Sequence, residues 1–178
     1  MAKKISFNLS MASIRAAQQE IQKYQQDLSR KCEILCRRLT EEGIRVAQAH
    51  IDESPLGKTI ILRSEITPEQ AGCKAILFAV GQIKESDGFA PFNTLLAVEF
   101  GAGIYHNKKQ NPKASEFGIG VGTFPGQIHA FEDGWYYWSE KAKRWEFTHG
   151  VKATMPMYYA GKEMREKLIS IAREVFKS

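Results

Sequence analysis

The sequence predicts an α+β fold in which a long N-terminal helix and a C-terminal helix pack on a small, mainly antiparallel β-sheet. Three observations predict it. An apolar stripe of helical period lies near each end of the chain, two runs of strand character lie between them, and a glycine-rich stretch without periodicity predicts a long loop. A chain of 178 residues suits a single domain, 1–178.

The first helix is predicted over 10–52, with Ser10 as its N-cap because a serine hydroxyl accepts from amides of the first turn. Gly43 is the expected point of a bend. About 40 helical residues would extend about 60 Å, longer than one small sheet covers, so we expect part of the stripe to pack on a neighbouring subunit. The stripe repeats at spacings of three and four: Ile14, Ala17, Ile21, Tyr24, Leu28, Cys32, Leu35, Leu39, Gly43 and Val46.

A β-hairpin is predicted over 58–81. Residues 59–66 and 73–80 have strand character, and the turn-forming sequence 67–72 separates them. The second strand is apolar at both parities, so we expect it to be central and covered on both faces. Residues 82–88 are polar and are expected to be exposed.

Four elements are predicted in the second half of the chain. Pro91 is expected to open a short helix over 91–101. Residues 104–134 predict a long loop, and 135–148 an aromatic hairpin stabilised by cross-strand pairs. The C-terminal helix is predicted over 156–176, from the apolar stripe Met157, Ala160, Met164, Leu168, Ile171 and Val175.

The composition is that of an ordinary globular protein, with 43% hydrophobic and 25% charged residues. No apolar run is long enough for a membrane span or a secretion signal, so we expect neither. Cys32, Cys36 and Cys73 are then expected to be reduced thiols in a cytosol. The net charge of +5 is compatible with nucleic acid or an acidic partner, but the cations are spread along the chain, which favours a solvated surface.

Few residues offer chemistry. Cys32 and Cys36 lie one helical turn apart, but no second Cys/His pair completes a zinc site, so packed thiols are favoured. The four histidines are scattered, and nothing marks Cys73 as an activated nucleophile. The glycines of 118–122 lack the lysine and the helix start of a phosphate loop, so turn glycines are favoured. We therefore predict no catalytic residue, no metal ligand and no cofactor.

Glu99 is a lone carboxylate just before the glycine turn 101–103. Three roles are open for it: a general acid or base, an acceptor for backbone amides of the glycine turn, or a salt bridge to a neighbouring subunit. No second carboxylate or histidine stands at a defined spacing, so a structural role is favoured over catalysis.

The candidate interface combines this turn, a basic loop and the aromatic hairpin. A basic and aromatic loop can grip single-stranded nucleic acid, but ordering against a protein partner is favoured. In the hairpin we expect half of the aromatic side chains to face the core and half a partner, because a strand alternates its two faces. The candidate residues are Glu99, Phe100, Tyr105, Lys108, Lys109, Phe117, Phe124, Trp135, Tyr137 and Trp145.

The order of the short motifs carries a family resemblance. LLAVEFGAGIY (95–105), the glycine-rich loop, WYYW (135–138) and THGVKATMPMYYA (148–160) precede the terminal helix. In this order the chain resembles the tail-completion, or head–tail joining, proteins of long-tailed double-stranded DNA phages and prophages, which include minor capsid proteins. The matching positions are Glu99-Phe100-Gly101, Gly150, Pro156, Met157 and Ala160. Ala102, where the family commonly has threonine, and the long 104–134 insertion depart from the pattern.

The resemblance implies a noncatalytic virion protein with an α+β fold, present in the host cytoplasm during assembly and in the neck or tail of the virion. Its partners would be further copies of itself in a ring, often a hexamer, together with connector or neck proteins and tail-tube proteins. A head-closure or tail-terminator ring is the nearest alternative. Alternatives of another class are a nucleic-acid-binding protein with a DNA contact, or a small hydrolase using Glu99.

Overall fold

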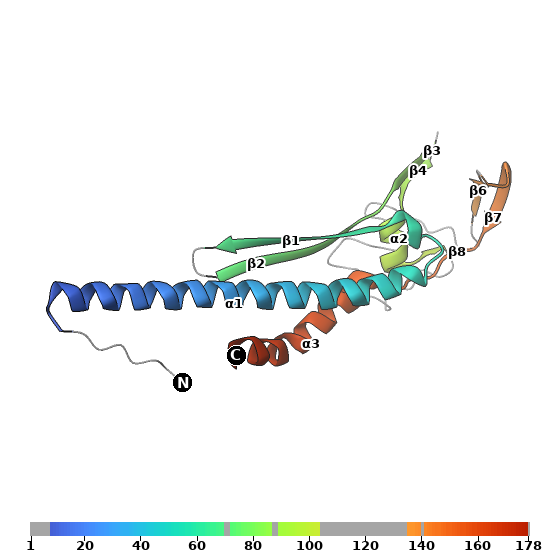
Figure 1. The fold of residues 1–178 in the computed structure, drawn as a ribbon. Helices are drawn as coiled ribbons and strands as arrows, with labels where there is room; N and C mark the ends of the chain where they lie inside the picture. The colour runs from blue at the N-terminus through green and yellow to red at the C-terminus, as the bar shows by residue number, and fades with distance from the viewer. Residues whose placement is uncertain (1–7, 70–71, 87–88, 104–134, 140, 178) are drawn as a thin grey trace.

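The computed structural model describes residues 8–69, 72–86, 89–103, 135–139 and 141–177, and it confirms the α+β class (Figure 1). The elements follow in the order α1 (Met11–Asp52), η1 (Gly57–Thr59), β1 (Ile61–Glu69), β2 (Gly72–Val80), β3 (Ile83–Ser86), β4 (Phe89–Asn93), α2 (Thr94–Phe100), β5 (Ala102–Gly103), β6 (Trp135–Ser139), β7 (Arg144–Thr148), β8 (Gly150–Val151) and α3 (Pro156–Lys177).

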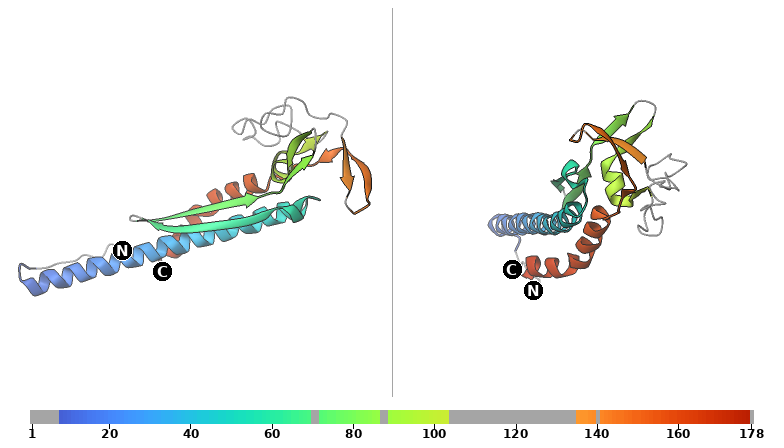
Figure 2. Two further views of the ribbon diagram at one scale, coloured as in Figure 1. Left: turned by 90° about the horizontal axis from the view of Figure 1, so that it is seen from above. Right: turned by 90° about the vertical axis from the view of Figure 1, so that its right-hand side faces the viewer.

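The molecule is elongated along α1. The β1–β2 hairpin lies along one side of α1 and α3 along another, and the N-terminal part of α1 extends beyond both (Figures 1 and 2). The strands that the structure describes pair as four separate antiparallel ladders, β1–β2, β3–β4, β5–β8 and β6–β7. None of the described helices is long and apolar enough to cross a membrane.

The long helix α1 begins where the sequence predicts, because the Ser10 hydroxyl accepts from the amide of Ser13 at 3.3 Å. The expected bend at Gly43 does not occur, since α1 is one continuous helix through that residue. A Cβ at this buried glycine would lie 2.7 Å from the sulfur of Met164 and 2.9 Å from a methyl carbon of Leu77. Gly43 therefore lets side chains of β2 and α3 pack closely against the backbone of α1.

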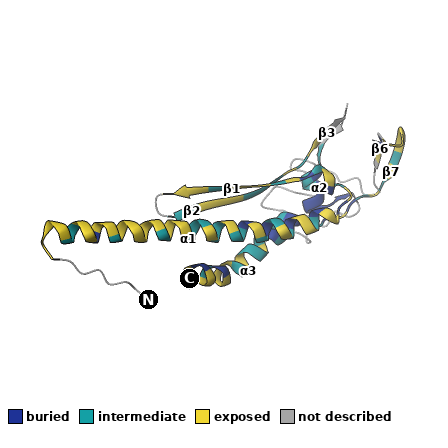
Figure 3. Ribbon diagram, in the orientation of Figure 1, coloured by how far each residue is buried: buried dark blue, intermediate teal, exposed yellow. Residues whose placement is uncertain are grey.

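The core is small and sits at the C-terminal end of α1 (Figure 3). One cluster joins Ile51 of α1, Ile60 before β1 and Val98 of α2. A second, adjoining cluster joins Ala97 of α2 to Ala102 and Val151 in the β5–β8 ladder. The apolar surface that stabilises the fold by its removal from water is thus concentrated at one end of the molecule.

The short helix starts later than predicted. Pro91 lies in β4, and α2 begins at Thr94 because the Asn93 side chain accepts from the amides of Leu95 and Leu96, at 3.0 and 3.3 Å. The preceding polar stretch is also ordered, since Ile83 of β3 pairs with Asn93 of β4. The helix start is therefore set by the Asn93 N-cap, and not by Pro91 as predicted.

The remaining elements lie close to their predicted bounds. The β6–β7 hairpin occupies 135–139 and 144–148, and α3 runs from 156 to 177. The two-residue ladder between β5 and β8 has no local sequence signal, because its strands are separated by 46 residues. The predicted 104–134 loop lies outside the described residues.

Candidate interaction surfaces

The Glu99 carboxylate joins α2 to the start of α3. Its side chain is in the core, with the residue 7% exposed. Its two oxygens accept from the backbone amides of Met157, at 2.9 Å, and Tyr158, at 3.0 Å. These amides belong to the first turn of α3, whose N–H groups have no partner within the helix. A negative charge there is also stabilised by the helix dipole, so Glu99 serves as an N-terminal cap supplied by another element.

Backbone contacts next to Glu99 fix the same junction. The amide of Thr154 donates to the carbonyl of Val98 at 2.9 Å, and Met155 turns the chain with a left-handed φ of 52°. Consecutive residues of α2 therefore hold the approach to α3 and its first turn. Of the three roles open for Glu99, the structure shows the binding of backbone amides. These amides belong to α3 and not to the glycine turn.

Glu99 and its neighbour Phe100 are both buried within the chain itself. An interface assignment for these two residues therefore has to be corrected, because their side chains present little surface to a partner. The order Glu-Phe-Gly reflects packing: Glu99 caps α3, Phe100 packs against Leu96, and Gly101 ends α2 with a φ of 79°.

The β6–β7 hairpin displays an aromatic face. The register pairs position 136 with Phe147 and position 138 with Trp145, so these four positions share one face. Tyr136 and Phe147 are exposed and meet edge to face at 5.1 Å, and Trp145 is 62% exposed. Positions 135 and 137 lie on the opposite face. The predicted interface of Trp135, Tyr137 and Trp145 is therefore divided between the two faces of the hairpin.

The N-terminal half of α1 carries an exposed apolar stripe made of Ile21, Tyr24 and Leu28. Tyr24 is the most exposed of the three, at 61%. The stripe continues the face of α1 that packs against α3 nearer the core, where His50 stacks on Tyr159 with ring centroids 4.5 Å apart. Because α1 extends past the end of α3, this apolar face emerges into solvent (Figures 1 and 3).

A second exposed apolar surface is the outer face of the β1–β2 hairpin. Its apolar residues are Ile61, Ile76, Phe78 and Val80. The register places Ile61 opposite Val80, Arg63 opposite Phe78 and Glu65 opposite Ile76, so the apolar cluster follows β2 and is flanked by charged side chains of β1. Ile61 is 56% exposed, and Ile76 and Val80 are also exposed. The inner face, which includes Leu77, lies on α1. The expectation that the second strand is covered on both faces is therefore wrong for the described chain: β2 has α1 on one side only.

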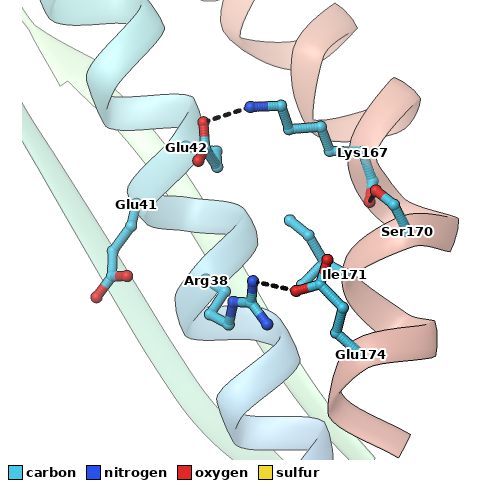
Figure 4. A pocket seen from close by; sticks show the side chains of 7 residues that line it. All are labelled: Arg38, Glu41, Glu42, Lys167, Ser170, Ile171 and Glu174. Atoms are coloured by element: carbon cyan, nitrogen blue, oxygen red, sulfur yellow. Dashed lines mark hydrogen bonds and ion pairs between the residues drawn. The ribbon is translucent and has the colours of Figure 1, made fainter. Parts of the chain in front are cut away.

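Charged side chains close the seam between α1 and α3. Lys167 donates to Glu42 at 2.9 Å, and Arg38 pairs with Glu174 at 2.6 Å (Figure 4). Lys167 also approaches Glu163 at 3.1 Å. The hydrogen bond from Lys167 is the main reason why the pKa of Glu42 is lowered, and the bond to Glu42 raises the pKa of Lys167. These pairs line an open groove of about 290 Å³, and they satisfy one another within it.

Two cysteines meet where the hairpin begins to cover α1. The Cys36 thiol donates to the carbonyl of Cys73 at 3.5 Å. Burial, and then the neighbouring Cys73 thiol, raise the pKa of Cys36 to about 11. Cys36 is thus a packed thiol with little thiolate at neutral pH. Within the described part of the chain, no three His, Cys, Asp or Glu side chains gather as a metal site would require.

The other predicted interface residues cannot be placed. Tyr105, Lys108, Lys109, Phe117 and Phe124 lie outside the described residues. Sequence reasoning did not single out the outer face of the hairpin as a surface. Its signal was present, because a strand that is apolar at both parities, in a sheet of two strands, leaves one apolar face uncovered.

Together these features define an elongated α+β protein with three groups of exposed apolar or aromatic side chains, on α1, on the outer hairpin face and on the β6–β7 hairpin. Comparisons with protein-family models, with curated proteins and with solved structures found no match to this chain.

Proposed function

We propose that this chain is a noncatalytic structural protein of a phage or prophage virion, acting at the head–tail junction as a tail-completion or joining component. Two kinds of support are independent of each other. One is the order of the motifs, from Glu99-Phe100-Gly101 to Pro156-Met157, which resembles that family. The other is the physical character of the exposed surface.

The observation that carries the proposal is the amount of apolar surface that this elongated scaffold presents to solvent. The stripe of α1 and the β2 side of the outer hairpin face each present several exposed apolar side chains close together. A soluble monomer rarely exposes such patches unless they bind something. A protein that functions only after it has joined an assembly keeps them exposed until its partners arrive.

The aromatic face of the β6–β7 hairpin supports contact with a second kind of partner. Tyr136, Trp145 and Phe147 project from a two-stranded unit at the end of the molecule remote from the free end of α1 (Figure 1). Aromatic side chains dominate the binding energy at many protein interfaces. This hairpin is the best candidate among the described elements for the contact with connector or tail-tube protein.

The hydrolase alternative used Glu99 as its acid or base. Both oxygens of this carboxylate accept from backbone amides of α3, and the residue is in the core. A proton-transferring group has to reach a substrate, so this arrangement favours the structural role.

Deletion of the gene from its phage or prophage tests the proposal. We expect DNA-filled heads and separate tails in electron micrographs, with joined particles restored by the wild-type chain supplied in trans. Cryo-electron microscopy of restored virions should place the chain at the neck. Normal infectious particles from the deletion strain would refute the proposal. Salt-sensitive, tight binding of the purified chain to DNA would favour the nucleic-acid alternative instead.

A further inference from the structure

We propose that copies of this chain join through unlike surfaces: the α1 stripe (Ile21, Tyr24 and Leu28) of one copy packs on the outer face of the β1–β2 hairpin of the next. The inference deepens the proposed function, on which it rests, by naming the two surfaces through which the copies meet. It assigns one occupant, a second copy, to both surfaces.

The dimensions of the two surfaces agree. The part of α1 that precedes Cys36, whose thiol contacts the start of β2, comprises residues 11–35 and at 1.5 Å per residue is about 37 Å long. The nine residues of β1 span about 27 Å at 3.4 Å per step. On these elements the stripe from Ile21 to Leu28 is about 10 Å long and the apolar positions from Ile76 to Val80 about 14 Å. The helix is therefore long enough to run along the apolar cluster of the sheet, and its stripe matches about 10 Å of the cluster's roughly 14 Å.

The chain already makes a contact of this kind within itself. The C-terminal half of α1 lies on the inner face of the same hairpin. Cys36 of α1 contacts Cys73 at the start of β2, and Ile51 of α1 belongs to the same cluster as Ala79 at the end of β2. The hairpin thus accepts a helix along its length. Covering its outer face with a second helix would place the sheet between two helical layers, the usual environment of a strand that is apolar at both parities.

One heterologous contact covers both exposed surfaces, which is the argument for a second copy over a foreign protein. If two stripes paired with each other about a two-fold axis, the outer face of each hairpin would remain in water. If a foreign partner covered one surface, the other would remain exposed. Contact between stripe and hairpin removes both from solvent at every junction. A heterologous contact repeated by a rotation that closes gives a ring, which is the arrangement that leaves no stripe or hairpin face uncovered.

The area of the contact predicts how the ring forms. A helix footprint about 27 Å long and 10 Å wide removes on the order of 540 Å² from the two partners together. A stable pair of proteins buries about 1,200–2,000 Å², so two copies should associate only weakly. In a closed ring every copy makes the contact twice, and closure converts weak pairs into a stable assembly.

Photo-crosslinking of the purified chain tests the contact directly. The residue p-benzoylphenylalanine replaces Tyr24, whose aromatic ring it resembles, and mass spectrometry identifies the peptides attached after irradiation. We expect crosslinks between copies that fall within residues 61–80. Crosslinks to residues 14–28 would mean that the stripe pairs with itself, and the absence of any crosslink between copies would mean that a foreign partner covers it; either result overturns the proposal. The same probe at Gln26, on the polar side of α1, should give none.

A variant of the opposite surface provides the second test. Ile76→Lys places a charge in the outer face of the hairpin. Because the side chain is exposed, the variant should keep its fold, which circular dichroism verifies. In this variant, we expect the crosslink yield of the probe at position 24 to decrease at least tenfold. Ala142→Lys, which adds the same charge at the exposed turn of the β6–β7 hairpin, should leave the yield unchanged. Equal yields in the two variants would refute the contact.

The two proposals fail separately. If the crosslinks fall elsewhere while deletion of the gene still leaves heads and tails unjoined, the contact is wrong and the proposed function stands. If the crosslinks fall within 61–80 while the deletion strain makes normal virions, the self-association is real and the head–tail role is wrong.

Discussion

Replacement of Glu99 by glutamine tests the central junction of the fold. Glutamine has nearly the same shape as glutamate, but its amide offers only one acceptor oxygen to the two N–H groups that Glu99 now binds, at 2.9 and 3.0 Å. Its NH₂ group would face the second amide as donor against donor. The substitution therefore removes one charge-assisted hydrogen bond and the negative charge at the N-terminus of α3, with little change in packing.

The expected cost follows from these two losses. A hydrogen bond to a charged group contributes about 1.5–3 kcal/mol, and a charge beside a helix N-terminus about 0.3–1 kcal/mol. Glu99→Gln should therefore lower the free energy of unfolding by about 3 kcal/mol. For a chain of this size, that loss corresponds to a decrease in Tm of about 6–12 °C.

Urea and thermal unfolding, followed by circular dichroism, measure this cost. Glu166→Gln is the matched control, because Glu166 lies in α3 and its side chain is 61% exposed. Its ion pair with Lys162 is long, at 3.9 Å. That change should cost less than about 0.5 kcal/mol. Hydrogen exchange should show weakened protection of the first turn of α3 in the Glu99 variant alone. A stability within about 0.5 kcal/mol of the wild type would refute the capping role.

Three further predictions concern packing, charge and thiol reactivity. Gly161→Ala should stabilise the chain by about 0.5–1 kcal/mol, because a Cβ at this helical position meets open space. Gly43→Val should cost about 2 kcal/mol, because a Cβ there meets Met164 and Leu77. Stability changes of the same sign in chemical denaturation would contradict this contrast. The pKa of Glu42 is lowered from 4.5 and that of Lys167 is raised from 10.5, so their pair should stabilise the fold between these values and lose its effect as pH falls below the first or rises above the second. Lys167→Met should abolish the alkaline part of this dependence and weaken the acid part, since Arg45 still pairs with Glu42. An unchanged pH series of unfolding curves would contradict this. The pKa of Cys36 is raised from 9.0 to about 11, so its thiol should react with iodoacetamide at mildly alkaline pH about 100-fold more slowly in the folded chain than in urea. Mass spectrometry measures the two rates, and equal rates would contradict the burial of this thiol.

Local signals were sufficient for the long elements. The N-cap at Ser10 and the spacing of three and four define α1, whose observed bounds are Met11–Asp52. Strand character with a central turn likewise defines the β1–β2 hairpin. These predictions succeed because the hydrogen bonds that make a helix or a hairpin connect residues that are close in sequence.

The features that failed depend on distant residues. Gly43 resembled a weak point of an isolated helix, but its role depends on Met164 and Leu77, which reach it from other elements. The partners of Glu99 lie 58 and 59 residues further along the chain. Periodicity does not encode such contacts, so the sequence could limit Glu99 to a structural role without identifying the helix that it caps.

The arrangement of these junctions separates two tasks on one chain. The β5–β8 ladder pairs Gly103 with Gly150, so the chain that follows the aromatic β6–β7 hairpin returns to the core beside the end of α2. The Glu99 cap fixes α3 beside that same place. The free half of α1 and the outer hairpin face belong to elements that precede Glu99 in the chain (Figure 1). Under the two proposals, changes to the α1 stripe should therefore affect contacts between copies, while changes to the aromatic hairpin should affect binding to a second partner, because the two surfaces lie on different elements at opposite ends of the molecule (Figure 1).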